Sequence, residues 1–306
     1  DLSGLVPTTF GDVREPEALF RAIQEFDPDV IFHLAAQPIV RESMLNPLET
    51  LTTNAIGTAQ VLEYMRLANN LPVLVVITSD KVYQNMNWPW GYRESDELSQ
   101  QDPYSASKAM AETVISSYLY TYGQAGLGDG ISVGRAGNVI GGGDFAPGRL
   151  IPDVYRSIVE DRLLQVRNPE STRPWQHVLE PLSGYLTLAA CLLSGYGGVH
   201  GEAFNFGPSL EKAFTVGDVL QELRGQLEFD WEKESNPETF SFNEAQLLQL
   251  DWSKAASILS WRPVLAFDET ISWTARWYQQ LLRAAPSPEA IRKFTLDQLN
   301  EFRERL

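Results

Sequence analysis

Short apolar runs alternate with longer segments of helical periodicity over the first half of the chain. The apolar runs lie at residues 29–34, 73–78 and 131–139, and the helical patterns between them lie at 48–68 and 105–122. This alternation is typical of a parallel sheet whose strands are joined by crossover helices. The run from Val73 to Ile77 is apolar at every position, which suits a central strand covered on both faces. We therefore predict an α/β fold with a Rossmann-like, doubly wound parallel sheet.

The alternation of apolar runs and helical segments ends after Gly141. Three glycines at 141–143 and prolines at 147, 152, 169 and 174 separate shorter elements, and residues 287–305 form a charged, amphipathic terminal pattern. We predict a second, smaller lobe in this part of the chain. The predicted boundaries are a first domain over residues 1–147, which residues 176–206 also join, and a C-terminal substrate-binding lobe formed mainly by residues 148–306.

Charge and composition exclude several classes of partner. The 306 residues carry a formal net charge of -16, which would repel nucleic acid and an anionic membrane, so any anionic ligand must be held by local positive charge. No run approaches the roughly 18 apolar residues of a membrane span. The single cysteine, Cys191, lies in an apolar stretch, so it can form no disulfide within the chain and should pack as a small buried hydrophobe. We expect a soluble, cytoplasmic protein without nucleic-acid or membrane partners, and the sequence shows no cluster with metal-ligand spacing.

Tyr104 and Lys108 stand four residues apart in Tyr-Ser-Ala-Ser-Lys. On a helix this spacing places the phenol and the ammonium on one face. A neighbouring cation favours the phenolate form of a tyrosine, whose ordinary pKa is about 10. Ser79, Asp80 and Lys81 follow the second apolar run, and they add a hydroxyl, a carboxyl and an amine. Together these are the proton-moving groups that hydride chemistry on a sugar requires; the structural alternatives are a packing Tyr–Lys pair and a surface ion pair.

One expected feature is missing from the sequence. A dinucleotide-binding fold normally opens with a strand, a glycine-rich turn and a helix whose N-terminal amides hold the pyrophosphate. This chain starts with Asp1-Leu2-Ser3-Gly4, and the glycines at 141–143 lack the G-x-G-x-x-G spacing and lead toward prolines rather than a helix. We expect either that a strand–helix–strand unit of roughly 30 residues is absent from this sequence or that the cofactor site is crippled.

Five short motifs occur in the order found in the extended short-chain dehydrogenase/reductase family, which the chain resembles. They are Gly11-Asp12-Val13-Arg14, His33-Leu34-Ala35-Ala36-Gln37, Asn54 with Gly57-Thr58, Thr78-Ser79-Asp80-Lys81, and Tyr104 with Lys108. Within that family, four longer runs are similar to the CDP-glucose 4,6-dehydratases: Trp88 to Glu94, Arg135 to Asp144, Arg149 to Asp153, and Arg173 to Leu182. The Tyr–Lys pair alone is weak evidence, whereas the run that begins Arg-Pro-Trp-Gln-His is specific.

The resemblance implies NAD-dependent dehydration of CDP-D-glucose to CDP-4-dehydro-6-deoxy-D-glucose, a lyase reaction. Tyr104 would take the proton of the sugar 4-hydroxyl as hydride leaves C4, and Lys108 would hold the nicotinamide ribose and stabilise the phenolate. Ser79 would bond to the same hydroxyl. Related dTDP-glucose dehydratases carry Asp-Glu where this chain has Asp80-Lys81, so Lys81 is the candidate base at C5 and Asp80 the candidate acid at C6.

The same resemblance supplies the binding residues. For NAD they are Asp12 and Val13 at the adenine edge, Leu34, Ala35 and Ala36 beside the diphosphate and ribose, and Thr78, Tyr104 and Lys108 near the nicotinamide. For the CDP-sugar they are Arg173 on the diphosphate, where a guanidinium offers forked donors, and Asn138, Leu150, Arg167 and His177 around the diphosphate and base. Taken alone, Ala35 and Ala36 are more typical of packing, and His33 is more typical of a buried, hydrogen-bonded core histidine.

Two other functions remain open at this point. A nucleotide-sugar 4-epimerase needs the same Tyr104, Lys108 and serine, but it needs no acid–base pair for elimination, so Asp80-Lys81 favours dehydration. A non-catalytic sensor or scaffold could keep the fold after losing its glycine-rich turn. By analogy with related enzymes we also expect a homodimer or higher homo-oligomer, with the helices at 48–68 and 105–122 packed across its axis.

Overall fold

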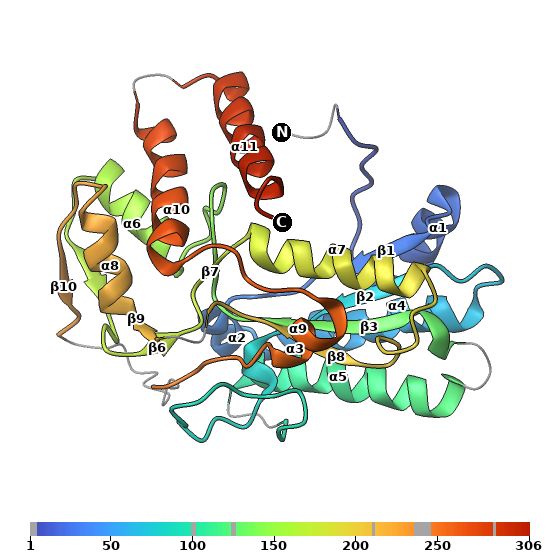
Figure 1. The fold of residues 1–306 in the computed structure, drawn as a ribbon. Coiled ribbons are helices and arrows are strands. Elements are labelled where there is room, and N and C mark those ends of the chain that lie inside the picture. Colours follow the sequence, from blue (N-terminus) through green and yellow to red (C-terminus); the bar gives the residue numbers. More distant parts are fainter. Residues whose placement is uncertain (1–4, 99–101, 124–126, 210–211, 236–245, 284–285) are drawn as a thin grey trace. The chain divides into compact units, whose positions relative to one another are not determined.

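The computed structural model describes residues 5–98, 102–123, 127–209, 212–235, 246–283 and 286–306 (Figure 1). The chain divides into two compact units. The first contains Asp1–Gln84, Glu97–Gly134 and Leu188–Ala203, and the second contains Asn85–Asp96, Arg135–Thr187 and Phe204–Leu306. This division departs from the predicted boundary at residue 147, because residues 85–96 and 135–147 belong to the second unit.

The four-stranded sheet explains where the first apolar runs lie. Its strand order is β1-β2-β3-β8. The strands are β1 Val30–His33, β2 Val73–Ile77, β3 Ile131–Ala136 and β8 Ala203–Phe206. β1, β2 and β3 are parallel, with His33 paired to Val76 and Ile77 paired to Gly134. The middle three positions of β2 are buried, as its continuous apolar run predicts, and the α/β class with a parallel sheet is confirmed.

Helices of the first unit pack on this sheet. They are α1 Pro16–Phe26, α2 Val40–Leu45, α3 Pro47–Leu51, α4 Gly57–Leu67 and α5 Pro103–Tyr122, with 3₁₀ turns η2 Asp80–Val82 and η4 Gly128–Gly130. α4 and α5 share a core with β2 and β3 in which Leu62, Leu74 and Ile131 are fully buried. Figure 1 shows α5 along one face of the sheet, with the part of α7 (Leu179–Leu193) that belongs to this unit on the other face.

The single helix predicted over residues 48–68 is interrupted. Between α3 and α4 the chain forms a π-helical turn, η1 Thr52–Ile56, which carries the buried Asn54. π-helical turns occur frequently at functional sites. The apolar pattern alone could not show this interruption, because the turn is fixed by side-chain bonds from Asn54 to a distant loop.

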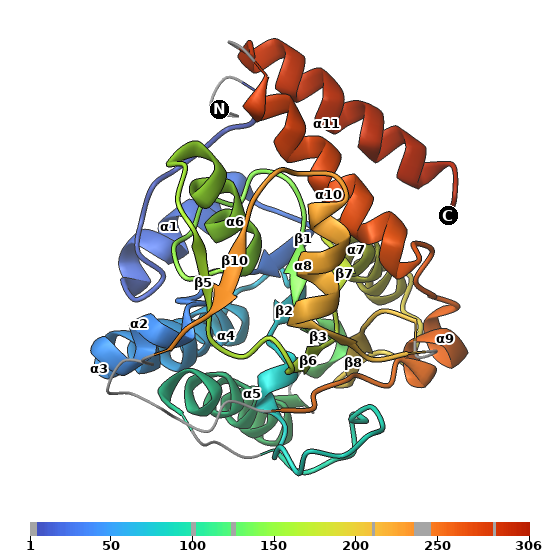
Figure 2. The ribbon, with the colours of Figure 1, turned by 90° about the vertical axis from the view of Figure 1, so that its left-hand side faces the viewer.

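The second unit has its own core and small sheets. Its remaining elements are β4 Val139–Ile140, α6 Leu150–Val159, β5 Leu164–Val166, β6 Thr172–Arg173, β7 Gln176–His177, β9 Phe214–Thr215, α8 Val216–Arg224, β10 Trp231–Lys233, α9 Ser253–Leu259, α10 Phe267–Leu282 and α11 Pro288–Arg303. Figure 2 shows β5 beside β10 and α8 beside α10, and the core between them buries Val219, Leu220 and Ile271 completely.

Residues 85–96 join the second unit through backbone hydrogen bonds to a segment more than 150 residues away. Tyr92 N–H donates to Gln249 O, and Asp251 N–H donates to Tyr92 O, both at 2.9 Å. A Cβ atom added at Gly91 would lie 2.6 Å from Asp251 N, so only glycine permits this approach. These long-range contacts explain why the sequence did not reveal the boundary.

Two smaller expectations have clear outcomes. Cys191 is only partly buried on α7, so the expectation of a fully buried residue is wrong. Within the described ranges, no helix has both the length and the apolar character that crossing a membrane demands.

Candidate active site

The carboxyl ends of β1 and β2 lead directly into two predicted motifs. Leu34, Ala35 and Ala36 follow β1, and the residues from Thr78 to Lys81 follow β2. Because the two strands are neighbours and parallel, both segments leave the same edge of the sheet, which is where ligands bind in open α/β sheets. Leu34 and Ala35 are exposed at this edge, and the small side chains of Ala35 and Ala36 leave the backbone open to a ligand.

Ser79 organises the start of η2. Its Oγ accepts the Lys81 N–H at 3.2 Å, which caps the 3₁₀ turn, and donates to Asp80 Oδ1 at 3.0 Å. A hydroxyl has one donor and two acceptor lone pairs. With its proton directed to Asp80, Ser79 can still accept a hydrogen bond from an external hydroxyl. Asp80 is only 3 % exposed, whereas Lys81 is half-buried.

Tyr104 and Lys108 occupy the first turns of α5, as predicted. The helix begins with Pro103 and is capped by Asp102, whose carboxylate accepts the Ser105 N–H at 3.0 Å. Both side chains are buried, and α5 packs against η2, which brings them into the same region as residues 79–81. Lys108 Nζ donates to Ile77 O at 3.3 Å. Burial lowers the pKa of Lys108 to about 8, and the charge of Glu112 acts in the opposite direction.

Asn54 ties this helix to the segment after β1. Its Oδ1 accepts the Gln37 N–H at 2.7 Å, and its Nδ2 donates to Gln37 O at 3.0 Å and to Ser107 Oγ at 2.8 Å. Ser107 Oγ in turn donates to Tyr104 O at 2.6 Å. The π-helical turn therefore fixes the beginning of α5, and with it the phenol, relative to the loop that follows β1. The sequence analysis used Asn54 only as part of a motif and did not predict this role.

His33 has the structural role that its position indicates. It is 6 % exposed, and its Nε2 lies 3.0 Å from Thr58 Oγ1. Thr58 gives its own proton to Asn54 O at 2.7 Å, so His33 Nε2 is the donor. Burial first, and the charge of Lys108 second, lower the pKa of His33 to about 4, which keeps the ring neutral. The structure confirms a buried, hydrogen-bonded histidine.

The candidate residues for the adenine edge lie in the motif before α1. Asp12 accepts hydrogen bonds from the Arg14 backbone N–H at 2.8 Å and from its guanidinium, and these bonds lower the pKa of Asp12 to about 2. Val13 packs against Gly57, where an added Cβ would lie 2.7 Å from Val13 Cγ1. Asp12 is therefore a fixed carboxylate, and Val13 has a packing role besides any contact with a ligand.

Arg173 lines an open pocket within the second unit, whose volume of about 470 Å³ includes space that is open to solvent. Its walls include Trp175, Lys212, Phe214 and Phe267, besides Arg173 itself. Phe214 and Phe267 are stacked with ring centroids 3.6 Å apart, and Lys212 Nζ lies 5.0 Å from the centre of the Phe214 ring. A concave site with aromatic walls and two cations suits a planar, anionic ligand. The pocket could not be read from the sequence, because its walls come from four separate segments between residues 173 and 270.

The other substrate candidates lie in different surroundings. Asn138 O accepts the Gln176 N–H at 3.0 Å, and Arg167 is exposed after β5. His177 is 2 % exposed and packs edge-on against Trp273, and burial lowers its pKa to about 4. None of these three lines the Arg173 pocket. Their contacts with a substrate stay predictions.

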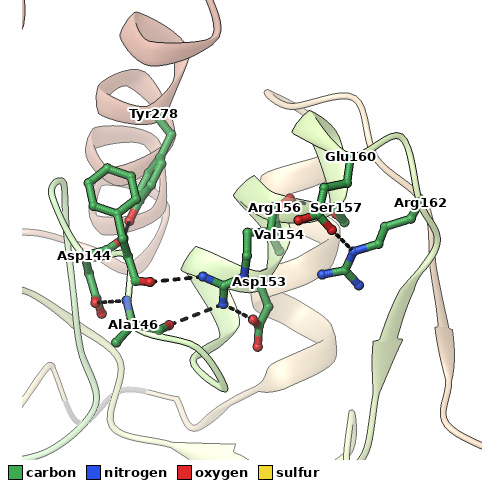
Figure 3. A network of polar contacts seen from close by, with 10 residues as sticks. Asp144, Ala146, Asp153, Val154, Arg156, Ser157, Glu160, Arg162 and Tyr278 are labelled. Atoms are coloured by element: carbon green, nitrogen blue, oxygen red, sulfur yellow. Dashed lines mark hydrogen bonds and ion pairs between the residues drawn. The ribbon is translucent and has the colours of Figure 1, made fainter.

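Leu150, the remaining candidate, is the first residue of α6. The loop before it contains Asp144 and Ala146, which are held by hydrogen bonds (Figure 3). The Arg156 guanidinium donates to Phe145 O at 3.0 Å and to Ala146 O at 3.3 Å, and it also pairs with Asp153. Tyr278 Oη donates to Asp144 O at 2.6 Å from α10. These bonds hold the loop on both sides, so that the backbone leading into Leu150 has a defined position.

Comparisons with known proteins show which family the chain is similar to. The GDP-mannose 4,6 dehydratase family model matches residues 5–274. A CDP-glucose 4,6-dehydratase from Salmonella typhimurium is 43 % identical over 292 residues, which cover 92 % of this chain and 79 % of that protein. The dTDP-glucose 4,6-dehydratase 1 of Escherichia coli is 25 % identical over 297 residues, which cover 87 % of this chain and 77 % of that protein.

Solved structures share the fold. A dTDP-glucose 4,6-dehydratase from Streptomyces venezuelae, solved with NAD and TYD bound, has a TM-score of 0.73 at 25 % identity and covers 88 % of this chain and 78 % of its own. A UDP-glucose 4-epimerase from Thermotoga maritima, solved with UDP-glucose, has a TM-score of 0.76 at 20 % identity and covers 92 % and 88 %. The match to the family model and the identity to the Salmonella enzyme together show that this chain belongs to the 4,6-dehydratase family that the GDP-mannose 4,6 dehydratase model describes.

Proposed function

We propose that the protein is an NAD-dependent hydro-lyase that converts CDP-D-glucose to CDP-4-dehydro-6-deoxy-D-glucose. The observation that carries this proposal is the placement of Ser79, Asp80 and Lys81 on η2, packed against the helix that presents Tyr104 and Lys108. Identity of 43 % to a CDP-glucose 4,6-dehydratase supports the nucleotide and the reaction.

The residues present fit NAD. Lys108 is a buried ammonium with three donors. Within the described part of the chain it donates to Ile77 O, which leaves donors for a ribose diol. Leu34, Ala35 and Ala36 would flank the diphosphate and ribose, and Asp12 with Val13 the adenine edge. When bound, NAD⁺ supplies the acceptor for the electron pair that leaves C4 and is later returned to C6.

Tyr104 removes the proton of the sugar 4-hydroxyl as C4 is oxidised. The positive charge of Lys108 on the same helix face favours the phenolate, so the tyrosine can act as a base near neutral pH. Ser79 accepts a hydrogen bond from the same hydroxyl and orients it. After the electron pair has returned, the protonated phenol and the 4-ketone remain.

Asp80 and Lys81 then carry out the elimination. The new C4 ketone acidifies the C5 proton, which Lys81 removes, and Asp80 gives a proton to the departing C6 hydroxyl, so that one water leaves. When the electron pair returns to C6, the ammonium of Lys81 gives the proton back to C5. The low exposure of Asp80 keeps bulk water away from this proton transfer. The candidate acid Asp80 and the candidate base Lys81 are adjacent residues of η2. They directly follow Ser79, which orients the substrate.

The nucleotide diphosphate is assigned to the Arg173 pocket. Replacing Arg173 by lysine keeps the charge but removes the forked donors, so the KM for CDP-glucose should rise about tenfold or more with a smaller change in kcat. Steady-state kinetics with CDP-glucose measure this, and Arg224→Lys is the matched comparison, because Arg224 is exposed on α8 and pairs with Asp230. An unchanged KM in the Arg173→Lys variant would remove Arg173 from the binding site.

A 4-epimerase is the second candidate, because the Thermotoga maritima epimerase has the same fold. Product analysis after incubation with CDP-glucose and NAD⁺ separates the two functions. A 4-keto-6-deoxy sugar, which absorbs strongly in alkali, supports dehydration, and CDP-galactose supports epimerisation. Calorimetry tests whether the protein is instead a non-catalytic scaffold. The proposal requires that NAD⁺ binds, whereas a protein that binds neither NAD⁺ nor CDP-glucose would support the scaffold.

We also propose a homodimer built on the helices of the first unit. Leu48 on α3, Ile56 on η1 and Met110 on α5 are 76 %, 47 % and 43 % exposed, although α5 packs against both α3 and η1. Exposed apolar side chains on elements that pack together are typical of a surface that a second copy covers. Light scattering should give the mass of a dimer, and Met110→Glu should give a monomer; a wild-type monomer would refute the proposal. A cytoplasmic location stays a prediction.

A further inference from the structure

Glu112 is a buried carboxylate that the sequence analysis did not identify. It lies on α5 four residues after Lys108, which itself lies four residues after Tyr104, so the three side chains share one helix face. Glu112 is 7 % exposed, and its Oε1 accepts the Thr78 hydroxyl proton at 2.6 Å. A carboxylate is costly to bury without hydrogen-bond or charged partners, so the contacts of Glu112 indicate its role.

The contact with Thr78 connects two parts of the active site. Thr78 directly follows β2 and precedes Ser79, and its backbone N–H donates to Gly134 O at 2.9 Å. Lys108 Nζ donates to Ile77 O, the residue before Thr78. Lys108 and Glu112 therefore hold consecutive residues of the same segment, and they fix η2 against the catalytic face of α5.

Glu112 also acts on the charge of Lys108. Desolvation by burial lowers the pKa of Lys108 to about 8, and the negative charge of Glu112 opposes this shift. Among the titratable groups on elements near Lys108 are His33 on β1, Asp80 and Lys81 on η2, and Tyr104 on α5 itself. The other elements packed against α5 carry Arg41 and Glu42 on α2, Glu49 on α3, and Glu63, Tyr64 and Arg66 on α4. His33 is neutral over the working range because its pKa is lowered to about 4, so it adds no positive charge there.

We propose that Glu112 is a positioning residue of the reaction, which places a negative charge one helix turn from Lys108 and holds the Thr78–Ser79 segment against α5. It does not touch the reacting atoms. Its carboxylate acts through Lys108 on the phenolate of Tyr104, and through Thr78 on the placement of Ser79. This inference rests on the proposed function for its kinetic consequence, but its electrostatic part can be measured without substrate.

Two substitutions separate the two contributions. Glu112→Gln removes the charge and retains a carbonyl oxygen that can accept the Thr78 proton. Thr78→Val removes the hydrogen bond and retains the charge. Loss of the charge should lower the pKa of Lys108 by about one unit, because a charge one helix turn away acts strongly where water is excluded. The sign follows from electrostatics: with less negative charge nearby, Lys108 loses its proton at lower pH.

The experiment combines a titration with a pH profile. Protein labelled with carbon-13 at the lysine Cε is titrated by NMR without ligands, and Lys108→Arg identifies the Lys108 signal. The alkaline limb of the kcat profile with CDP-glucose is then recorded for the same variants. We expect both the titration and the limb to move to lower pH by about one unit in Glu112→Gln, but not in Thr78→Val. Glu63→Gln, which alters a carboxylate on α4 paired with Arg66, should leave both unchanged.

The outcomes are distinct. A Lys108 titration in Glu112→Gln that coincides with the wild type overturns the inference, as does an equal shift in Thr78→Val, which would make the hydrogen bond rather than the charge responsible. If the wild type does not convert CDP-glucose at all, the proposed function fails, whereas the titration still decides whether Glu112 sets the charge of Lys108.

Discussion

Replacing Tyr104 by phenylalanine should lower kcat for CDP-glucose by about 10³-fold, which is within the usual contribution of a general acid–base group. Phenylalanine fills the same buried space at the start of α5, so the helix, its Asp102 cap and the Asn54–Ser107 contacts stay in place. The substitution removes only the hydroxyl that takes the proton of the sugar 4-hydroxyl. Oxidation at C4 then has no base, and neither product nor reduced nicotinamide should form.

Steady-state kinetics measure the turnover of this variant, and calorimetry measures its affinity for NAD⁺. NAD⁺ should bind to Tyr104→Phe with an affinity within about threefold of the wild type, because Lys108 is retained. Tyr118→Phe is the matched control, since Tyr118 lies on the same helix and donates to Glu63 at 3.1 Å, away from the site. Turnover by Tyr104→Phe at a rate close to that of the control would assign the base to another residue.

Replacing Lys81 by methionine should stop the reaction one step later. Methionine keeps an unbranched side chain of similar length on η2 but cannot accept the C5 proton, so the product rate should fall by about 10²-fold or more. The electron pair still leaves C4. Because elimination is blocked, it cannot return to C6, and the near-ultraviolet absorbance of reduced nicotinamide should rise and persist.

This signature distinguishes Lys81 from Tyr104, whose variant gives no such absorbance. Lys293→Met is the control, because Lys293 is exposed on α11 and pairs with Asp297, one turn away on the same helix. Wild-type product formation by Lys81→Met would mean that Lys81 is not the base. A low product rate without the absorbance would mean that Lys81 acts before or during the oxidation of C4.

The sequence predicted those parts of the fold and site that depend on nearby residues. The continuous apolar run gave β2 with its central positions buried, and the four-residue spacing placed Tyr104 and Lys108 together on one helix. These predictions succeeded because backbone periodicity alone decides which side chains share a face.

Features that depend on distant residues could not be predicted in this way. The π-helical turn at Thr52–Ile56 places Asn54 where it bonds to Gln37 and Ser107, and residues 85–96 are bonded to the second unit through Tyr92, which pairs with Gln249 and Asp251. Glu112 gains its importance from Thr78, which lies 34 residues earlier. Only the spacing Tyr104, Lys108, Glu112 could have drawn attention to that carboxylate, and the spacing does not reveal its partner.

The central claim is that the hydrogen removed from C4 of the hexose is returned to C6 of the same molecule while one water is lost. CDP-glucose carrying deuterium at C4, incubated in ordinary water with the protein and NAD⁺, tests it most directly. We predict a product lighter by one water, with a 4-ketone and the deuterium bound to C6, as seen by NMR and mass spectrometry. Deuterium retained at C4, or a product that has lost water but carries no deuterium at C6, would contradict the account.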